Sequence, residues 1–318
     1  MTYSAGSLIQ STDYNGFVST TAGANINATW NTAYGQTALS TVAAAATISA
    51  TQWATLNGTI STMASHQGTT ITSRTNPTAN TIISVLTNVN TDITNCYNNL
   101  YNAVASGTQY TAWTGQASKL TPTGSGGAAW TITFTNTVTF ANTTAASNFF
   151  NAGGLVKIQF SKTSTGTTED TEWNAFIGTT CGTIYLSSTA ASKTISGGTY
   201  TGTTKVGGTG TPSILATGTG YAQLTSTPVT IYKQSDSGTA YTNNYLQVNA
   251  SVSGAVITFT TTWFDDGTAL SAVISGGSNT SGITFGTAPA TVVTYFPPEQ
   301  TYLSPVWGTP TVAASVPQ

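Results

Sequence analysis

The 318-residue chain has only 7 basic and 9 acidic side chains, so 5% of it is charged and its formal net charge is −2. Ordinary soluble domains carry about 25% charged residues, and so few cations cannot form the basic stripe that follows nucleic-acid phosphates. The 39% apolar and 10% aromatic content excludes a charged, disordered tail and indicates a folded core.

Residues 1–107 are predicted to be a helical region for oligomerisation or attachment. Between Ile48 and Met63, apolar residues recur at steps of three and four, with Thr47 or Ser49 available as the N-cap. Residues 13–34 show a less regular helical pattern, because glycines interrupt it. The pattern therefore predicts one clear amphipathic helix preceded by a less continuous helical segment.

A second helix is predicted to begin at Asn76-Pro77 and to stop before Gly107. Its apolar residues alternate at steps of four and three, which is the spacing of a heptad seam. The seam consists of Ile82, Leu86, Val89, Ile93, Cys96, Leu100 and Ala103. A coiled coil between copies and one helix of an intramolecular bundle both use such a seam, and both interpretations stay open. Self-association is slightly favoured, because the Thr- and Asn-rich polar face consists of poor helix formers that need packing partners.

Residues 108–295 are predicted to form an antiparallel β domain, because short runs alternate between apolar residues and Thr. The expected strands are Trp130–Phe140, Leu155–Phe160, Thr183–Leu186, Tyr221–Leu224, Val229–Tyr232, Tyr245–Val252 and Val256–Trp263, with a turn at Ser253-Gly254 and short helices at Thr143–Phe150 and Glu169–Phe176. Many short strands separated by turn signals favour a jelly-roll-like β-sandwich. The fold class is therefore α+β, with a helical or coiled-coil N-terminal region before the β-sandwich.

The stretch 296–318 contains five prolines and is predicted to be an extended C-terminal arm, lying on its own domain or on a neighbour. No apolar run approaches the roughly 18 residues of a membrane span. The N-terminal residues lack the basic and apolar regions of a signal peptide. We therefore expect no membrane span and a protein that is kept in the cytoplasm of its producing cell until it assembles.

The residue types that carry most enzyme chemistry are scarce. His66 is the sole histidine, no Gly-x-Ser-x-Gly elbow accompanies it, and it is better interpreted as part of a helix C-cap. Cys96 and Cys181 are isolated and are interpreted as buried free thiols. One histidine and two distant cysteines cannot form a structural zinc site, so we expect no catalytic residue, no cofactor and no metal of this kind.

Two acidic clusters offer alternatives. Paired carboxylates can hydrolyse glycosides or bind calcium. The clusters are Glu169, Asp170 and Glu172, and Asp265-Asp266. The first is more simply the acidic first turn of a helix, and the second a turn at the end of a strand. Whether Asp265 and Asp266 bind calcium stays open at this point.

A separate hypothesis is a sugar-binding module. Aromatic side chains can stack on sugar rings while Asn, Thr and Asp hydrogen-bond the hydroxyl groups. The candidate glycan contacts are Tyr241, Tyr245 and Trp263. This hypothesis does not exclude a structural role for the rest of the chain.

Several short sequence motifs, taken together and in this order, resemble those of structural proteins in the virions of tailed phages, including phages of cyanobacteria. They are Ser11-Thr12-Asp13-Tyr14-Asn15, Tyr34-Gly35-Gln36, Ala50-Thr51-Gln52-Trp53-Ala54-Thr55-Leu56, Ser65-His66-Gln67-Gly68, Asn148-Phe149-Phe150-Asn151-Ala152-Gly153-Gly154 and Trp263-Phe264-Asp265-Asp266. The resemblance covers about residues 8–75 and 145–267. It implies a non-enzymatic particle component with an N-terminal helical part and a C-terminal β domain.

The expected function is therefore a virion structural protein, a tail fibre or a tail- or baseplate-associated appendage that self-assembles. A nearly uncharged surface fits this function, because identical copies can pack without burying unpaired ions. The expected partners are further copies of the chain, with a trimer favoured by analogy with phage fibres, other virion proteins and a glycan on the host surface. A head-decoration or collar protein, or a carbohydrate-binding module, is the alternative.

Overall fold

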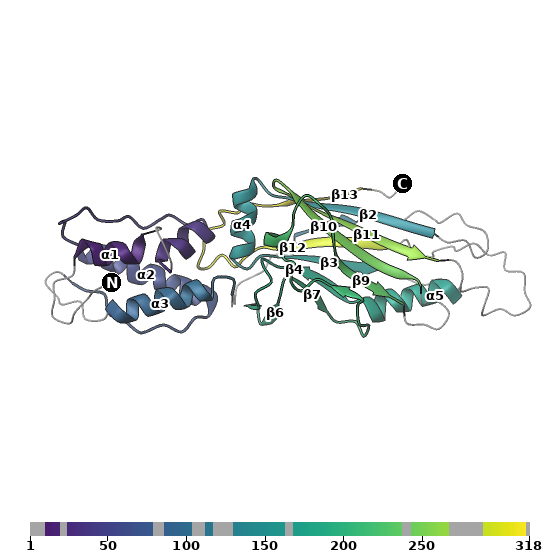
Figure 1. Ribbon diagram of the computed structural model, residues 1–318, viewed down its shortest axis with the longest axis horizontal. Helices are drawn as coiled ribbons and strands as arrows, with labels where there is room; N and C mark the ends of the chain where they lie inside the picture. The colour runs from purple at the N-terminus through teal and green to yellow at the C-terminus, as the bar shows by residue number, and fades with distance from the viewer. Residues whose placement is uncertain are drawn as a thin grey trace, which may run out of the picture.

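The computed structural model describes residues 10–19, 24–78, 86–103, 112–116, 130–162, 168–236, 243–266 and 289–315. These residues form an elongated molecule, with helices α1, α2 and α3 at one end and the β-sheets at the other (Figure 1). The strands pair antiparallel in every sheet, so the class is α+β, as predicted. None of the helices within the described ranges is long and apolar enough to cross a membrane.

The helical part contains α1 (Ser11–Val18), the π-helix η1 (Ala28–Ala33), α2 (Ala50–Gln67) and α3 (Leu86–Asn98). Ser49 caps α2, because its side chain accepts a hydrogen bond from the Gln52 N–H while the Gln52 side chain accepts one from the Ser49 N–H. Helix α2 ends at Gly68, whose φ of 67° is the left-handed conformation that glycine adopts without strain. Trp53 of α2 packs edge-to-face against Tyr14 and Phe17 of α1.

The heptad seam packs inside the chain. Val89, Ile93 and Cys96 are buried in the same hydrophobic cluster as the apolar residues of α1 and α2, and Leu100 packs against it. Ile82 lies outside the described residues, and the structure says nothing of the Leu86 side chain. Ala103 is buried in a separate cluster beside Ile195. Val89, Ile93 and Cys96 thus pack against other apolar residues of their own chain, and a coiled coil is not confirmed.

The β part contains a five-stranded sheet in the order β1-β12-β3-β4-β7. Its strands are β1 (Ala112–Gln116), β12 (Ala290–Phe296), β3 (Leu155–Ser161), β4 (Thr183–Leu186) and β7 (Thr203–Val206). A six-stranded sheet has the order β13-β2-β11-β10-β9-β8. Its strands are β13 (Thr311–Ser315), β2 (Trp130–Thr139), β11 (Val256–Asp265), β10 (Tyr245–Ser253), β9 (Val229–Ser235) and β8 (Ile214–Leu215). A two-stranded hairpin joins β5 (Lys193–Ile195) to β6 (Gly198–Tyr200).

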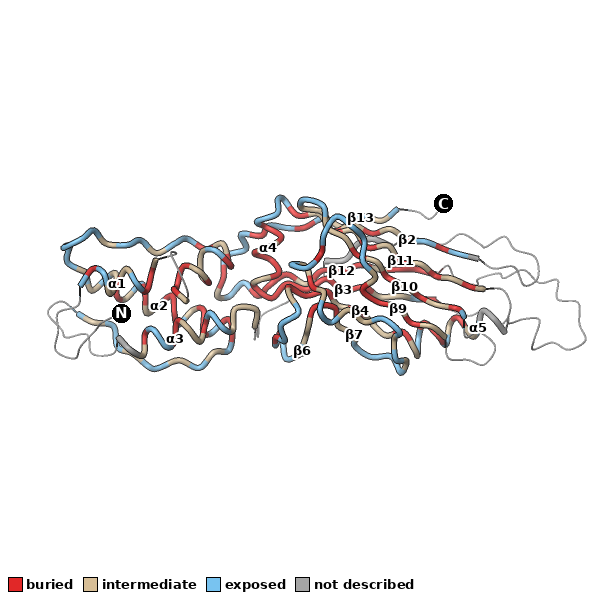
Figure 2. The backbone as a smooth tube through the Cα atoms, in the orientation of Figure 1, coloured by how far each residue is buried: buried red, intermediate tan, exposed pale blue. Residues whose placement is uncertain are grey.

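Alternate residues of the two larger sheets share one hydrophobic core, which includes Ile158 and Val293 of one sheet and Phe259 and Trp263 of the other. Figure 2 shows the buried residues gathered along the strands of the β part. Helices α4 (Thr143–Asn151) and α5 (Thr168–Ala175) lie where helices were predicted, and the π-helix η2 (Phe176–Cys181) follows α5 directly. Trp173 of α5 stacks on Trp263, with ring centroids 5.6 Å apart.

One prediction about local structure needs correction. Residues 221–224 do not form a strand, because η3 (Tyr221–Gln223) is a 3₁₀-helix that precedes the buried Leu224. In the C-terminal stretch 296–318, predicted to be an extended arm on its own domain or on a neighbour, β13 pairs with β2 and completes the six-stranded sheet. The predicted boundary at residues 107 and 108 falls outside the described residues.

Hydrogen bonds between distant residues join the helical part to the β part. Gln36 donates through Nε2 to the Ser304 carbonyl oxygen and accepts from the Ser304 N–H, each at 3.0 Å. His66 lies 3.1 Å from the Ala152 carbonyl oxygen at the end of α4. The joint is therefore polar but buried, because Gln36, His66 and Ala152 are all buried.

Candidate functional site

The solvent-facing side of the six-stranded sheet is almost uncharged. Successive side chains of a strand point to opposite faces, and the buried members of β2, β10 and β11 alternate with half-buried or exposed ones. The outward residues of β2 and β11 are Thr131, Thr133, Thr135, Thr137 and Thr139, and Val256, Thr258, Thr260, Thr262 and Phe264. Thr suits a strand because it is β-branched, and it brings a hydroxyl group to this outer face without adding charge.

An aromatic pair lies at one end of the outer face. Tyr245 of β10 is directly opposite Phe264 of β11, and their rings stack with centroids 4.8 Å apart. The Lys233 ammonium group lies 3.9 Å from the centroid of the Tyr245 ring, within cation–π range. Both aromatic residues are half-buried. Lys233 is the sole charged side chain that the described parts of β2, β9, β10 and β11 present on this face.

Two amide side chains follow the aromatic pair along β10. Asn249 Oδ1 accepts hydrogen bonds from the Thr230 hydroxyl group at 2.8 Å and from Gln247 Nε2 at 3.1 Å. These two bonds fix the orientation of the Asn249 amide. Among the described residues, nothing bonds to Asn249 Nδ2 or to Gln247 Oε1, so β10 presents an oriented donor beside an oriented acceptor.

The five-stranded sheet carries a comparable, half-buried aromatic cluster on its outer side. Tyr185 of β4 contacts Tyr200 of β6 edge-to-face and lies 6.4 Å from the Phe296 ring, and the Lys157 ammonium is 5.7 Å from that ring. These rings pack against the buried Ala103, Leu155 and Ile195. The hairpin β5–β6 contributes Tyr200 to this cluster, and Tyr185, Tyr200 and Phe296 are half-buried, as Tyr245 and Phe264 are.

Of the three predicted glycan contacts, one lies on the outer face of the sheet and one lies in the core. Tyr245 lies on the outer face, and Tyr241 is outside the described residues. Trp263 is fully buried and stacks on Trp173, so it is not available on the surface. Its neighbour Phe264, which the sequence analysis missed, occupies the outward position. The period-two pattern of β11 was the signal that could have identified Phe264.

Asp265 and Asp266, the second acidic cluster, accept hydrogen bonds from side chains of the β part. Asp265 is buried, and its Oδ2 accepts hydrogen bonds from Trp173 Nε1 at 2.9 Å and from Asn244 Nδ2 at 2.7 Å. Asp266 accepts one from Asn243 Nδ2 at 2.6 Å. Within the described ranges, no group of three or more His, Cys, Asp or Glu residues is arranged to hold a metal ion. The side chains of Glu169 and Asp170 are outside what the structure describes.

The other reactive side chains are buried. Burial lowers the pKa of His66 to about 4, against weaker opposing effects of the Ala152 carbonyl and of Glu299. Burial raises the pKa of the Cys96 thiol to about 12 and that of Cys181 further. These residues are therefore a neutral imidazole and unreactive thiols at neutral pH. His66 lies in the last turn of α2 rather than in its cap, because Gly68 supplies the left-handed residue.

Lys193 is a buried cation without a carboxylate partner among the described residues. Its ammonium donates hydrogen bonds to Ser187 Oγ at 2.9 Å and to the Thr189 carbonyl oxygen at 2.6 Å. Burial lowers its pKa to about 8. Ser187 is also fully buried, so this Ser–Lys pair has no access to a substrate and holds the 187–193 turn together.

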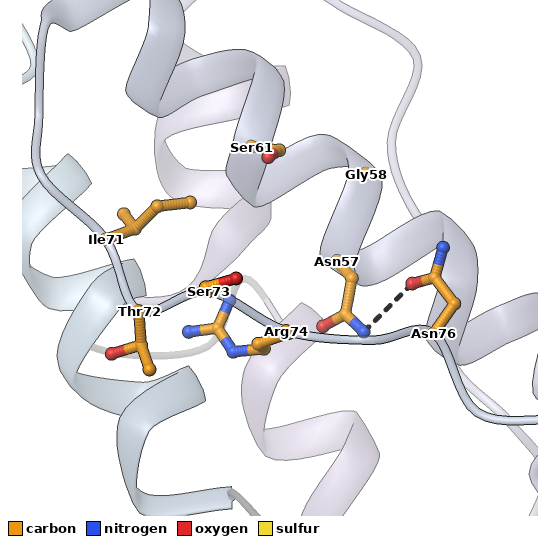
Figure 3. A pocket seen from close by; sticks show the side chains of 8 residues that line it. All are labelled: Asn57, Gly58, Ser61, Ile71, Thr72, Ser73, Arg74 and Asn76. Atoms are coloured by element: carbon orange, nitrogen blue, oxygen red, sulfur yellow. Dashed lines mark hydrogen bonds between the residues drawn. The ribbon is translucent and has the colours of Figure 1, made fainter.

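A cavity of about 290 Å³ lies in the helical part (Figure 3). It is lined by Asn57, Gly58, Ser61, Ile71, Thr72, Ser73, Arg74 and Asn76. The Arg74 guanidinium pairs with Asp92 of α3 and Asn57 donates to Asn76. Arg74 Nε and Asn57 Oδ1 have no partner among the described residues, but both atoms are shielded from solvent. These contacts attach the segment 69–78 to α2 and α3.

Comparison with known proteins gave no match to a family model, to a curated protein or to a solved structure. A functional proposal therefore depends on the geometry of the outer face and on the short sequence motifs that resemble those of phage structural proteins. The outer face combines hydroxyl groups, oriented amides and a half-buried aromatic pair. Such a surface can form neutral hydrogen bonds and stacking contacts with a partner.

Proposed function

We propose that the chain is a non-catalytic structural protein of a tailed-phage virion, tail-fibre-like, which associates with further copies of itself and contacts the host surface. The observation that carries this proposal is the outer face of the six-stranded sheet. It is uncovered by the described elements and uncharged except for Lys233. A surface of this composition can meet another protein or a host polymer without the desolvation cost of unpaired ions.

The arrangement of the molecule supports separate roles for its two ends. The outer face belongs to the β part, and the helical part lies at the other end of the elongated chain (Figure 1). We infer that the two larger sheets form a jelly-roll-like sandwich that presents the face outward. The helical end then attaches to other virion proteins or to sister copies. Since Val89, Ile93 and Cys96 of the seam are buried within the chain, we infer that this attachment uses the outer surface of the helices.

The state of the reactive groups also supports a structural role. Asp265 binds Trp173 and Asn244, and Asp92 binds Arg74. His66 is buried and neutral at pH 7. Each of these groups stabilises the fold in a position that a substrate does not reach.

The test is the mass of the purified full-length chain, measured by sedimentation equilibrium and light scattering, followed by immunogold labelling of virions. The expected result is a homo-oligomer, with a trimer favoured, and gold at the tail of the particle. A chain that stays monomeric at micromolar concentration and does not label particles would overturn the proposal. Gold at the head or collar would instead support a decoration or collar protein.

A further inference from the structure

A short exposed segment joins the N-terminal residues of the helical part to helix α2. Residues 43–47 are four alanines followed by Thr47, and all five are exposed. The one hydrogen bond described for them runs from the Ala46 N–H to the Ala43 carbonyl oxygen, 3.1 Å away, and closes a turn inside the segment. This segment, which we call the hinge, thus has no described hydrogen bond to the rest of the molecule.

The backbone of the hinge is strained at Ala45. Its φ is 62°, in the left-handed region where the Cβ atom comes too close to the backbone. A turn with a positive φ at its third residue usually has Gly or Asn there. Every other positive φ among the described residues belongs to a glycine, except that of Ser196, whose N–H is held by the Ala103 carbonyl oxygen at 2.9 Å. No described hydrogen bond holds Ala45, so opening of the hinge releases this strain.

The chain is firmly held on both sides of the hinge. Before it, the Asn15 amide of α1 binds both backbone groups of Val42, accepting from the N–H and donating to the carbonyl oxygen, each at 2.8 Å. The Asn27 amide binds Leu39 in the same way, at 2.9 and 2.8 Å. After the hinge, α2 begins with its capping box. The described residues between 10 and 42, which we call the N-terminal unit, are therefore tied together and can move as one piece relative to α2.

The N-terminal unit packs on the following helices through specific, buried contacts. Tyr14 and Phe17 lie edge-to-face against Trp53 of α2. The Tyr34 hydroxyl group donates to the Leu100 carbonyl oxygen at 2.6 Å. Tyr14, Phe17 and Tyr34 are all buried in the main hydrophobic cluster. These contacts are the same whether the unit and α2 belong to one copy or to two, because the hinge alone links them along the chain.

We propose that the hinge opens in the assembled protein and that the N-terminal unit of each copy packs on α2 and α3 of a second copy, in a closed set of two or three chains. Exchange re-forms the contacts of the unit and releases the strain at Ala45, so it needs no new apolar surface. A short hinge under strain favours such an exchange. This inference rests on the proposed self-association and names the segment that holds sister copies together, which leaves the outer surface of the helices to other virion proteins.

A second copy of this chain is the partner that fits the N-terminal unit. The Gln36 amide binds both backbone groups of Ser304, each at 3.0 Å, so a different partner would have to reproduce this pairing as well as the aromatic contacts. Charge does not oppose the approach of two copies. Asp13 is the one Asp, Glu, Lys or Arg among the described residues 10–19 and 24–47, and α2 contains none.

Sedimentation equilibrium of full-length hinge variants tests the exchange. Ala45→Gly removes the strain from the closed hinge, and we expect it to weaken association about tenfold for each hinge. Ala45→Val increases the strain, because a β-branched residue tolerates a positive φ worse than Ala does, and should strengthen association. The matched control is Ala44→Gly, an equally exposed neighbour without a positive φ, which should associate as the unchanged chain does.

Nuclear Overhauser effects between copies identify the exchanged unit directly. Copies with ¹³C-labelled Tyr and Phe and copies with ¹⁵N-labelled Trp are mixed in urea and refolded together. The expected result is an effect between Tyr14 or Phe17 of one copy and the Trp53 indole of another. Trp53 is buried, so an oligomer built on outer surfaces does not give this effect. The same mixture made with Ala45→Gly should give a weaker effect at equal concentration.

The outcomes separate the exchange from assembly itself. If the chain forms an oligomer whose association is the same for both Ala45 variants, and no effect joins Trp53 to another copy, the exchange is wrong and the assembly proposal stands. If the unchanged chain and Ala45→Val are both monomeric at micromolar concentration, both proposals are wrong. Unfolding temperatures of the variants are measured on the same samples, and we expect all of them to fold because the hinge is exposed.

Discussion

The replacement His66→Gln should make the joint between the two parts of the molecule insensitive to mild acid. His66 is fully buried, and its Nε2–H donates to the Ala152 carbonyl oxygen, so the imidazole is neutral with Nδ1 unprotonated. The Nδ1 atom has no hydrogen-bond partner among the described residues. Gln keeps a donor for the Ala152 oxygen but does not titrate near neutral pH.

The magnitude follows from the pKa of His66, which burial lowers from 6.5 to about 4. Between these values the unfolded chain binds a proton that the folded chain does not, so stability falls as the pH drops through this window. A difference of about 2.5 pKa units corresponds to about 3 kcal/mol, because each unit is worth about 1.4 kcal/mol. The pKa of about 4 already includes the weaker opposing effects of the Ala152 carbonyl and of the Glu299 carboxylate.

The assay is urea unfolding of both proteins at pH 7 and at pH 4, followed by tryptophan fluorescence. The expected result is that the unchanged protein loses about 3 kcal/mol more than His66→Gln between the two pH values. Titration of the carboxylates affects both proteins alike and cancels in the comparison. Because the chain has a single histidine, one imidazole NMR signal reports its pKa directly. A titration midpoint at 6.5 or above, or equal acid sensitivity of the two proteins, would refute the reasoning.

Three further predictions concern buried polar groups. Burial lowers the pKa of Lys193 to about 8, so the unfolded chain binds a proton between pH 8 and 10.5 that the folded chain does not. Over this range the unchanged protein should gain at most about 3 kcal/mol of unfolding free energy, whereas Lys193→Met should not. An equal pH dependence of the unfolding free energies of the two proteins would contradict this. Asp265→Ala removes the acceptor of two buried donors and should cost about 3 kcal/mol in urea unfolding, and an unchanged unfolding midpoint would contradict this. Gln36→Ala breaks both bonds to Ser304 and should speed amide hydrogen exchange at Ser304, and unchanged exchange would show that the joint does not depend on them.

Local signals in the sequence predicted the elements that depend on neighbouring residues. Ser49 with Gln52 three residues later is a complete capping box, and the predicted helix begins where it was expected. Strand β2 was evident from the alternation of Thr with apolar residues, and the turn at Ser253-Gly254 joins β10 to β11 as predicted. At Gly254 the φ of 57° explains why the turn contains a glycine.

Features that depend on distant residues were missed. The alternation in β11 shows that Trp263 and Phe264 face opposite sides, but which of them faces the core depends on Trp173, which is 90 residues away in sequence and stacks on Trp263. The seam of α3 suits an intermolecular or an intramolecular partner, and the sequence does not indicate that Val89, Ile93 and Cys96 share a buried cluster with α1 and α2. Strand β13 was not predicted, because prolines precede and follow it and its partner β2 is distant in the sequence.

The pairing of β13 with β2 affects how the chain folds while it is being synthesised. Strand β2 pairs with β11 on one side and with β13 on the other, and Gln36 near the N-terminus bonds to Ser304. While the ribosome is still making residues beyond 300, the edge of β2 is open and the joint has no C-terminal partner. Native closure of this molecule therefore waits for residues beyond 300 and is dominated by non-local contacts, for which slow folding is expected. During that interval the exposed edge is a site where nascent copies can mispair.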